Sequence, residues 1–556
     1  MNSSNNSVAP SRRSDSDMDC GSPLPLSPVS LAAAEDQTML DGQQAGLPKA
    51  AAGCRSPRRW TRRLLWTLIC LVSLLTLYYQ WENWRGAREL KAAHARLIQR
   101  FGTDDPEVFA PPTIPDEQNF FALPVIELWA TKPLEHGSRF KGYDIPKDAF
   151  VPANFPPPKL IEAEAGLPES VDWAAWSKNR DLKGETAAVV MNRELGDANG
   201  LLPKLAAGLS RPFACLKPGL REAFVASNNP ISQAAIPNVG NLNSHMRDLT
   251  LHLRAAAHAG DAANTQTTAL VALRFFPESC AAHGVLVTAL QSIATHRIAF
   301  DALHDALACA VWDERGLTLL QAQLAKDDDL QIINRALMSE TLWVHAMIAQ
   351  ARRKRAALES DGLLEIFSWR KDDSQWWMWW RRASDWLLRL GPIGWLDSDN
   401  AAYIDQMLET IGPDSATAWI EASSRTQAVR RRVAEQSTAV FPLPNVRRWV
   451  SCIGFPNIGS LHGAAAETLF HRRCLILACE LEKQRIQHGA YPAALPVMKG
   501  YDVSDPARPK QPPSYRLEKD GYLLWSAGPD AIDDGGLADK DWLWRMKRTP
   551  ETTPQR

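Results

Sequence analysis

The sequence predicts a mainly α-helical protein with a single transmembrane helix, a large helical domain beyond it and a small C-terminal α+β unit that holds a short antiparallel sheet. Three observations lead to this prediction. One unbroken apolar run, Leu64–Tyr79, lies between an Arg cluster and several aromatic residues. Helical spacing of apolar residues dominates from about Glu164 to Leu495. Two alternating strands follow near the C-terminus.

Residues 1–59 are rich in Ser, Ala, Pro and Gly and show no periodicity. A segment of this composition cannot bury enough apolar surface to offset the conformational entropy of its chain. We therefore expect a disordered tail.

Residues 60–81 are predicted to span a membrane. A helix needs about 20 mainly apolar residues to cross a bilayer core, and Trp60 and Trp81 would mark the two interfaces. A cleaved signal peptide needs a small-residue cleavage site, whereas this run continues into the bulky YYQWENWRG. We interpret it as an uncleaved signal anchor; the alternative is a buried helix of a soluble core.

The basic residues beside the span predict its orientation. Five Arg residues within 55–63 precede it, and Arg85, Arg88 and Lys91 follow it. Because the side richer in basic residues stays in the cytoplasm, we expect a cytoplasmic N-terminus and the bulk of the chain on the other side.

Residues 82–102 continue the helix as a predicted stalk. Apolar residues recur at helical spacing from Leu90 to Phe101, and Gly102 can end the helix. Residues 103–162 contain many prolines, which interrupt helices, so we expect an extended segment there.

Residues 163–463 are predicted to form the helical domain. The clearest helical hairpin lies within Asn241–Phe276, where Gly260 suits the position after a helix and Asp261 suits an N-cap. Asp313 is expected to cap a further helix. No fixed period is evident, so a repeat solenoid is the less favoured arrangement.

Trp369–Leu396 holds seven of the 21 tryptophans, interspersed with Arg. This composition is typical of a segment at a membrane interface, and packing inside the helical domain is the alternative. The residues expected to make interfacial contact are Trp376, Trp377, Trp379 and Trp380.

Charge and cysteine content exclude several classes of protein. A formal net charge of −1 provides no strong field for nucleic acid, so no nucleic-acid partner is expected. The nine cysteines are scattered and form no CxxC pair, which argues against a disulfide scaffold and a zinc site.

No catalytic constellation is evident. HExxH, GxSxG and Walker A motifs are absent from the sequence. The nearest approach to a cluster is His245, Asp248 and His252, which could share one helix face, but a surface salt link explains them as well as a metal does. We assign no catalytic and no cofactor-binding residue, and we expect a protein without enzymatic activity.

Residues 464–545 form the predicted α+β unit, and 546–556 a short tail. A helix ends at Gly489, two strands alternate within SYRLEKDGYLLWSAG about a turn at Lys519–Gly521, and the acidic loop GPDAIDDGG follows.

This order of motifs resembles the C-terminal half of type II secretion major pseudopilins over Glu467–Gly536, and the resemblance implies a pseudopilin-like head. The matching residues are Leu481, Glu482, Arg485, Gly489, Tyr491, Pro492, Asp505, Pro506, Tyr515, Arg516, Gly521 to Ser526, Gly528 and Asp530. Arg63-Leu64-Leu65 does not supply a prepilin signal, so the block looks like a head used by another kind of protein.

The rest of the chain resembles uncharacterised single-pass envelope proteins of the Planctomycetes and Verrucomicrobia, on the residues WENWRG and PPTIPDEQNFFALP. This resemblance implies a bacterial cytoplasmic (inner) membrane protein with its bulk in the periplasm. It implies no activity.

The acidic loop is a candidate calcium site. Calcium takes about six to eight oxygen ligands, and Asp530, Asp533 and Asp534 could supply several of them, with Asp539 or Asp541 completing the set. The resemblance to pseudopilin heads implies calcium in the equivalent loop. A solvated acidic turn is the alternative.

These observations favour a membrane-anchored envelope scaffold or protein-interaction protein, with the lipid bilayer and an unknown envelope protein as partners. The alternatives are an envelope hydrolase or modifying enzyme with its site in the helical domain, and a secretion-system accessory protein.

Overall fold

The computed structural model describes residues 57–109, 114–126, 158–161, 164–178, 180–196, 200–214, 239–275, 286–326, 328–353, 390–411, 418–438, 451 and 461–548. Nearly all of the predicted tail 1–59, the four tryptophans at 376, 377, 379 and 380, and the last residues, 549–556, lie outside these ranges.

The predicted transmembrane helix is the first part of α1, one continuous helix from Pro57 to Phe101. Among the described residues, α1 is the one helix long and apolar enough to cross a membrane, and none of its apolar window is buried inside the protein. It ends as predicted, because Gly102 adopts a φ of +76° and donates its N–H to Ile98 O at 2.8 Å.

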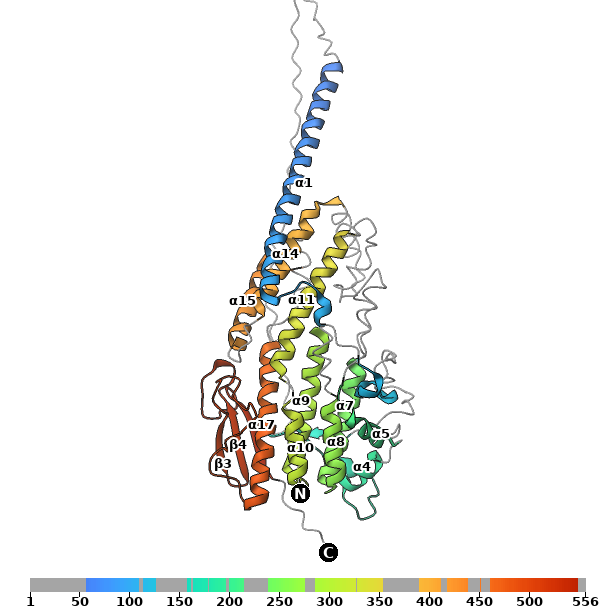
Figure 1. The fold of residues 1–556 in the computed structure, drawn as a ribbon, viewed down its shortest axis with the longest axis vertical. Coiled ribbons are helices and arrows are strands. Elements are labelled where there is room, and N and C mark those ends of the chain that lie inside the picture. The colour runs from blue at the N-terminus through green and yellow to red at the C-terminus, as the bar shows by residue number, and fades with distance from the viewer. Residues whose placement is uncertain are drawn as a thin grey trace, which may run out of the picture. The chain divides into compact units, whose positions relative to one another are not determined.

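The second part of α1 packs against α11 (Asp329–Arg353) and α14 (Ile393–Thr410) (Figure 1). Ala93 and Leu97 are fully buried in a cluster with Leu342 and Ile404. This part is therefore one element of the helical body, which differs from the expected stalk.

Four helices follow one another in the described part of 239–324 (Figure 1): α7 (Val239–His258), α8 (Ala262–Arg274), α9 (Leu286–Ala308) and α10 (Glu314–Leu324), of which α7 and α9 run parallel. The predicted caps are confirmed. Gly260 has a φ of +78°, Asp261 accepts the N–H of Asn264 at 3.1 Å, and Asp313 accepts that of Gly316 at 2.6 Å.

The remaining described elements are short, apart from two long helices. They are η1 (Pro106–Phe109), η2 (Asp116–Gln118), η3 (Phe120–Ala122), β1 (Leu160–Ile161), β2 (Ser170–Val171), α3 (Trp173–Ser177), α4 (Ala187–Gly196), α5 (Leu201–Ala207), η5 (Gly208–Ser210), α15 (Ala418–Thr438), α17 (Leu461–His488) and η9 (Gly528–Asp530). The strands β1 and β2 pair antiparallel.

A three-stranded antiparallel sheet follows α17, in the order β3 (Ser514–Glu518), β4 (Gly521–Ser526) and β5 (Trp542–Lys547). The predicted hairpin is confirmed, since Glu518 pairs with Gly521 across the turn. A side chain at Gly521 would collide with the backbone of Met546, so only glycine fits this close approach.

The third strand, β5, was not predicted. Its sequence WLWRMK alternates apart from Leu543: Trp542, Trp544 and Met546 face the core, and Arg545 and Lys547 lie on the other face. One face packs on α9 and α17, and the N–H of Arg545 donates to Gly166 O at 2.7 Å.

The sheet and the helices share one hydrophobic core. Tyr522, Leu524, Trp544 and Met546 belong to the same buried cluster as residues of α7 to α10 and α17. His304 of α9 stacks on Trp544 with ring centroids 3.9 Å apart. The small sheet is thus built directly onto the helical body.

Candidate functional site

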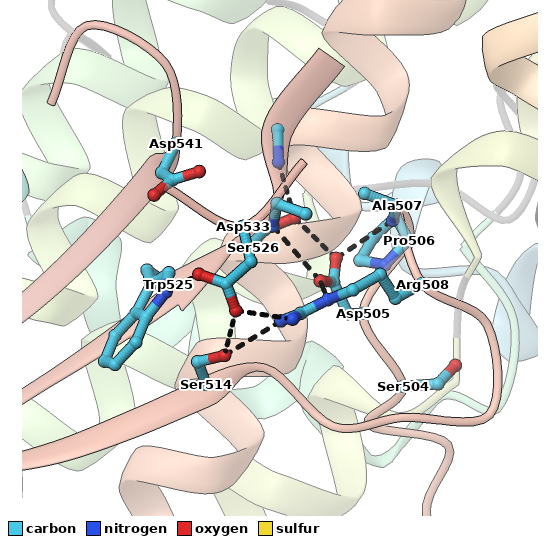
Figure 2. A network of polar contacts seen from close by, with 12 residues as sticks. Ser504, Asp505, Pro506, Ala507, Arg508, Ser514, Trp525, Ser526, Asp533 and Asp541 are labelled. Carbon is cyan, nitrogen blue, oxygen red and sulfur yellow. Dashed lines mark hydrogen bonds and ion pairs between the residues drawn. The ribbon is translucent and has the colours of Figure 1, made fainter. Parts of the chain in front are cut away.

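The acidic loop between β4 and β5 belongs to a polar network that begins at a buried carboxylate (Figure 2). Asp505 follows α17 in an irregular segment and is fully buried. It accepts hydrogen bonds from Ser526 Oγ at 2.5 Å, Ala507 N at 2.9 Å and Arg508 Nε at 2.9 Å. This buried anion therefore has its charge and its lone pairs satisfied locally.

Arg508 connects this carboxylate to the acidic loop, as Figure 2 shows. Its Nη1 donates to Asp533 Oδ2 at 2.6 Å. Asp533 also accepts from Trp525 Nε1 at 2.7 Å and Ser514 Oγ at 3.0 Å. The hydrogen bond from Trp525, followed by those from Gly535 N, Ser514 and Arg508, lowers the pKa of Asp533 to about 2.

The other two predicted calcium ligands have different partners. Asp534 Oδ1 lies 3.0 Å from Lys540 Nζ. The exposed Asp530 accepts the N–H of Ile532 at 3.0 Å. Asp541 accepts the backbone N–H groups of Gly536 at 2.7 Å and Leu537 at 3.1 Å.

The three predicted ligands, Asp530, Asp533 and Asp534, therefore do not converge in this arrangement. No group of three or more His, Cys, Asp or Glu in the described part of the chain is arranged to hold a metal ion. A calcium ion bound by all three would have to displace Arg508 and Lys540 from their carboxylates. Calcium binding stays a prediction, and Arg508 and Lys540 would compete with the ion for these carboxylates.

A second polar network lies at the end of α17 and includes Glu482, Arg485 and Tyr491, three of the residues that match pseudopilin heads. The buried Glu482 accepts from Arg485 Nε at 2.9 Å, from Arg548 Nη1 at 2.9 Å and from the Tyr491 hydroxyl. Burial, together with the Glu482 charge, raises the pKa of Tyr491, so this hydroxyl stays a donor. These residues hold the turn after α17 against the sheet.

The helical body contains a buried ion cluster that joins three helices. Arg472 of α17 donates through Nε to Asp329 Oδ2 at 2.8 Å, and Asp329 Oδ1 lies 2.5 Å from His296 Nδ1. Although burial opposes ionisation, Arg472 and His296 hold the pKa of Asp329 well below its usual range. Each charged group has its partner inside the cluster, so the cluster joins the three helices and leaves no charge among these residues for another role.

A second cluster joins α7 and α9. Arg254 lies 2.5 Å from Asp301 and 3.6 Å from Asp305, and His258 Nε2 lies 3.3 Å from both oxygens of Asp305. Burial alone would lower the pKa of His258, but Asp305 and the neighbouring Cys309 raise it to about 10.

This cluster contains a thiol, an imidazole and a carboxylate, the groups that a cysteine hydrolase uses. A protonated imidazole does not exclude such a site, because cysteine hydrolases hold their cysteine and histidine as a thiolate–imidazolium pair. Cys309, however, is buried, with 7% of its surface exposed, and its Sγ faces Asp305 O at 3.7 Å. The geometry fits a structural ion pair better than a nucleophile.

Of the group His245, Asp248 and His252, His252 has a packing role. His252 is fully buried, and its Nδ1 lies 3.1 Å from Thr268 Oγ1 on α8. Burial lowers its pKa to about 4, so it is neutral at neutral pH.

Arg508 was not among the residues predicted from the sequence, although it connects the acidic loop to Asp505. The available signal was its spacing of three residues from Asp505, which allows a local ion pair.

Comparison with known proteins adds no assignment: no family model, curated protein or solved structure matches this chain. The resemblance to pseudopilin heads therefore rests on the motifs alone.

Proposed function

We propose that this protein is a single-pass scaffold or protein-interaction protein of a bacterial inner membrane, with a cytoplasmic N-terminus and its helical body in the periplasm. The proposal rests on the difference in burial between the two parts of α1. Ala93 and Leu97 in the second part are fully buried, whereas the apolar run is exposed. The apolar side chains of Leu64, Leu71 and Leu74 are each more than half exposed. A bilayer is the surrounding that makes such exposure favourable.

The contacts inside the helical body favour a structural role over a catalytic one. Its buried charges at Arg472 and Arg254 each lie in ion clusters that join helices. These arginines therefore stabilise contacts between helices. The partner we propose is another envelope protein, together with the lipid bilayer.

We also propose that the Trp-rich segment with Trp376, Trp377, Trp379 and Trp380, which lies outside the described residues, contacts the membrane interface. Its composition supports this contact.

Alkaline carbonate extraction of membranes tests the anchor. We expect the wild-type chain to stay in the membrane pellet, and a Leu71→Arg/Leu74→Arg variant to be extracted, because each charge in a bilayer centre costs about 3 kcal/mol. Leu319→Arg, at an exposed position of α10, is the matched control and should stay in the pellet. Extraction of the wild type would contradict the proposal.

Two other functions remain as alternatives. One is an envelope hydrolase or modifying enzyme with a site in the helical body, which would be supported if the purified chain hydrolyses a chromogenic ester and a Cys309→Ser variant does not. A secretion-system accessory would be supported by co-purification with secretion components, on the strength of the pseudopilin-like motifs.

A further inference from the structure

Beyond its apolar run, α1 presents two different faces. One face packs on α14: Asn83 Oδ1 accepts the N–H of Gly394 at 2.9 Å. A side chain at Gly86 or at Gly394 would collide with the backbone of the other helix, so the two helices are in close contact there. This face fixes the body against α1 immediately after the apolar run.

The residues just before the N-terminus of α14 lie beside the last residues of the apolar run. The Tyr79 hydroxyl donates to the backbone oxygen of Leu390, three residues before α14 begins at Ile393. The Leu390 side chain is 62% exposed. The body thus brings an exposed apolar side chain level with the last residues of the run.

The other face of α1 carries exposed tryptophans and two arginines, of which Arg88 is exposed and Arg85 is half-buried and pairs with Glu89 at 3.2 Å. Trp81 and Trp84 are 50% and 60% exposed. The guanidinium of Arg85 lies 5.3 Å from the Trp81 ring, and that of Arg88 lies 5.6 Å from the Trp84 ring. Indole rings beside guanidinium groups suit a layer that is apolar on one side and rich in phosphate on the other.

The spacing along the helix fits one headgroup layer. Tyr79 and Trp84 are five residues apart, or about 7.5 Å at 1.5 Å per residue. The headgroup region on each side of a bilayer is about 5–8 Å thick. Helical side chains point back toward the N-terminus, so Arg85 and Arg88 extend back over the tryptophans toward this layer.

We propose that Trp81, Trp84, Arg85, Arg88 and Leu390 form a lipid-binding surface for anionic phospholipid headgroups of the bilayer that α1 crosses. The helical body then rests on the membrane surface. This inference depends on the membrane anchor proposed above, and it adds the position of the body and the class of lipid.

Electron paramagnetic resonance of the full chain in phosphatidylglycerol-containing nanodiscs tests the position of the body. A nitroxide is attached at Leu390→Cys, and its collision rates with oxygen and with a water-soluble nickel chelate are compared. The references are Leu74→Cys in the apolar run and Leu319→Cys on α10, which is 47% exposed. The chain without an introduced cysteine gives the background.

We expect the label at Leu390→Cys to lie between the two references, with a higher oxygen-to-nickel ratio than Leu319→Cys. Equal ratios at these two positions would overturn the inference. If Leu74→Cys is itself accessible to the nickel chelate, the membrane anchor fails, so the two failures are distinguishable.

Native mass spectrometry tests the lipid class. The full chain is released from nanodiscs of mixed phosphatidylglycerol and phosphatidylcholine, and retained lipids are counted. A basic residue near an anionic surface contributes about 1 kcal/mol, or about fivefold in binding. We expect Arg85→Gln/Arg88→Gln to retain at least fivefold less phosphatidylglycerol. Arg430→Gln/Arg431→Gln, at exposed positions of α15, is the control. Equal losses in the two variants, or none, would overturn the proposal.

Discussion

Arg508 Nη1 lies 2.6 Å from Asp533 Oδ2, and this contact places a guanidinium where the sequence predicts a calcium ion. Arg508 is held in place by the buried Asp505 on its other side. The acidic loop is therefore stabilised by a cation from the chain itself.

Replacing Arg508 should change how the loop responds to calcium. We expect Arg508→Gln to show a larger rise in melting temperature with millimolar calcium than the wild type, because Asp533 then loses its competing cation. Differential scanning fluorimetry of the full chain in detergent measures this difference. An absence of any calcium-dependent shift in both proteins would reject the calcium site.

Asp505 should be essential for the stability of the sheet. It is a fully buried carboxylate paired with Arg508, so Asp505→Ala should cost about 3–5 kcal/mol of unfolding free energy. Asp539→Ala, at an exposed position of the acidic loop, should cost less than about 0.5 kcal/mol. Chemical denaturation of both variants measures the costs, and similar values would contradict the assigned role.

The Tyr491 hydroxyl should stabilise the turn after α17. Removing its hydrogen bond to the charged Glu482 in Tyr491→Phe should cost about 1.5–3 kcal/mol. Tyr501→Phe removes a hydroxyl from a half-buried tyrosine of the same region and serves as the control. If Tyr501→Phe is as destabilising as Tyr491→Phe, the hydrogen bond to Glu482 is not the reason.

The pair of His258 and Asp305 should make stability depend on pH. The folded-state pKa of His258 is raised from 6.5 to about 10. The pair therefore stabilises the fold fully below about pH 6.5, and this contribution is lost as the pH rises toward 10. The stability difference between the wild type and His258→Gln should be largest near pH 6 and shrink by pH 10. A constant difference across this range would contradict the raised pKa.

Local signals predicted much of the fold. Gly260 and Asp261 mark a helix end and a helix start because glycine tolerates positive φ and aspartate caps N–H groups, and both effects act within a few residues. Gly102 and Asp313 were predictable for the same reasons. The hairpin turn before Gly521 is equally local.

Contacts between distant residues were not predictable in this way. Gly86 and Gly394 meet across more than 300 positions, and their order in the sequence does not indicate it. The acidic residues of the loop were recognised as a group, but the partners that separate them, Arg508 and Lys540, follow from the folded chain. Strand β5 was missed although Trp542, Trp544 and Met546 alternate with Arg545 and Lys547, because Leu543 interrupts a pattern only six residues long.

The most direct test of the account is protease treatment of intact spheroplasts carrying a chain with different epitopes at its two ends. With α1 as a membrane anchor and the body in the periplasm, the C-terminal epitope should be digested, while the N-terminal epitope survives on a small membrane-bound fragment. Recovery of the intact chain from the soluble fraction, or protection of the C-terminal epitope, would contradict this account.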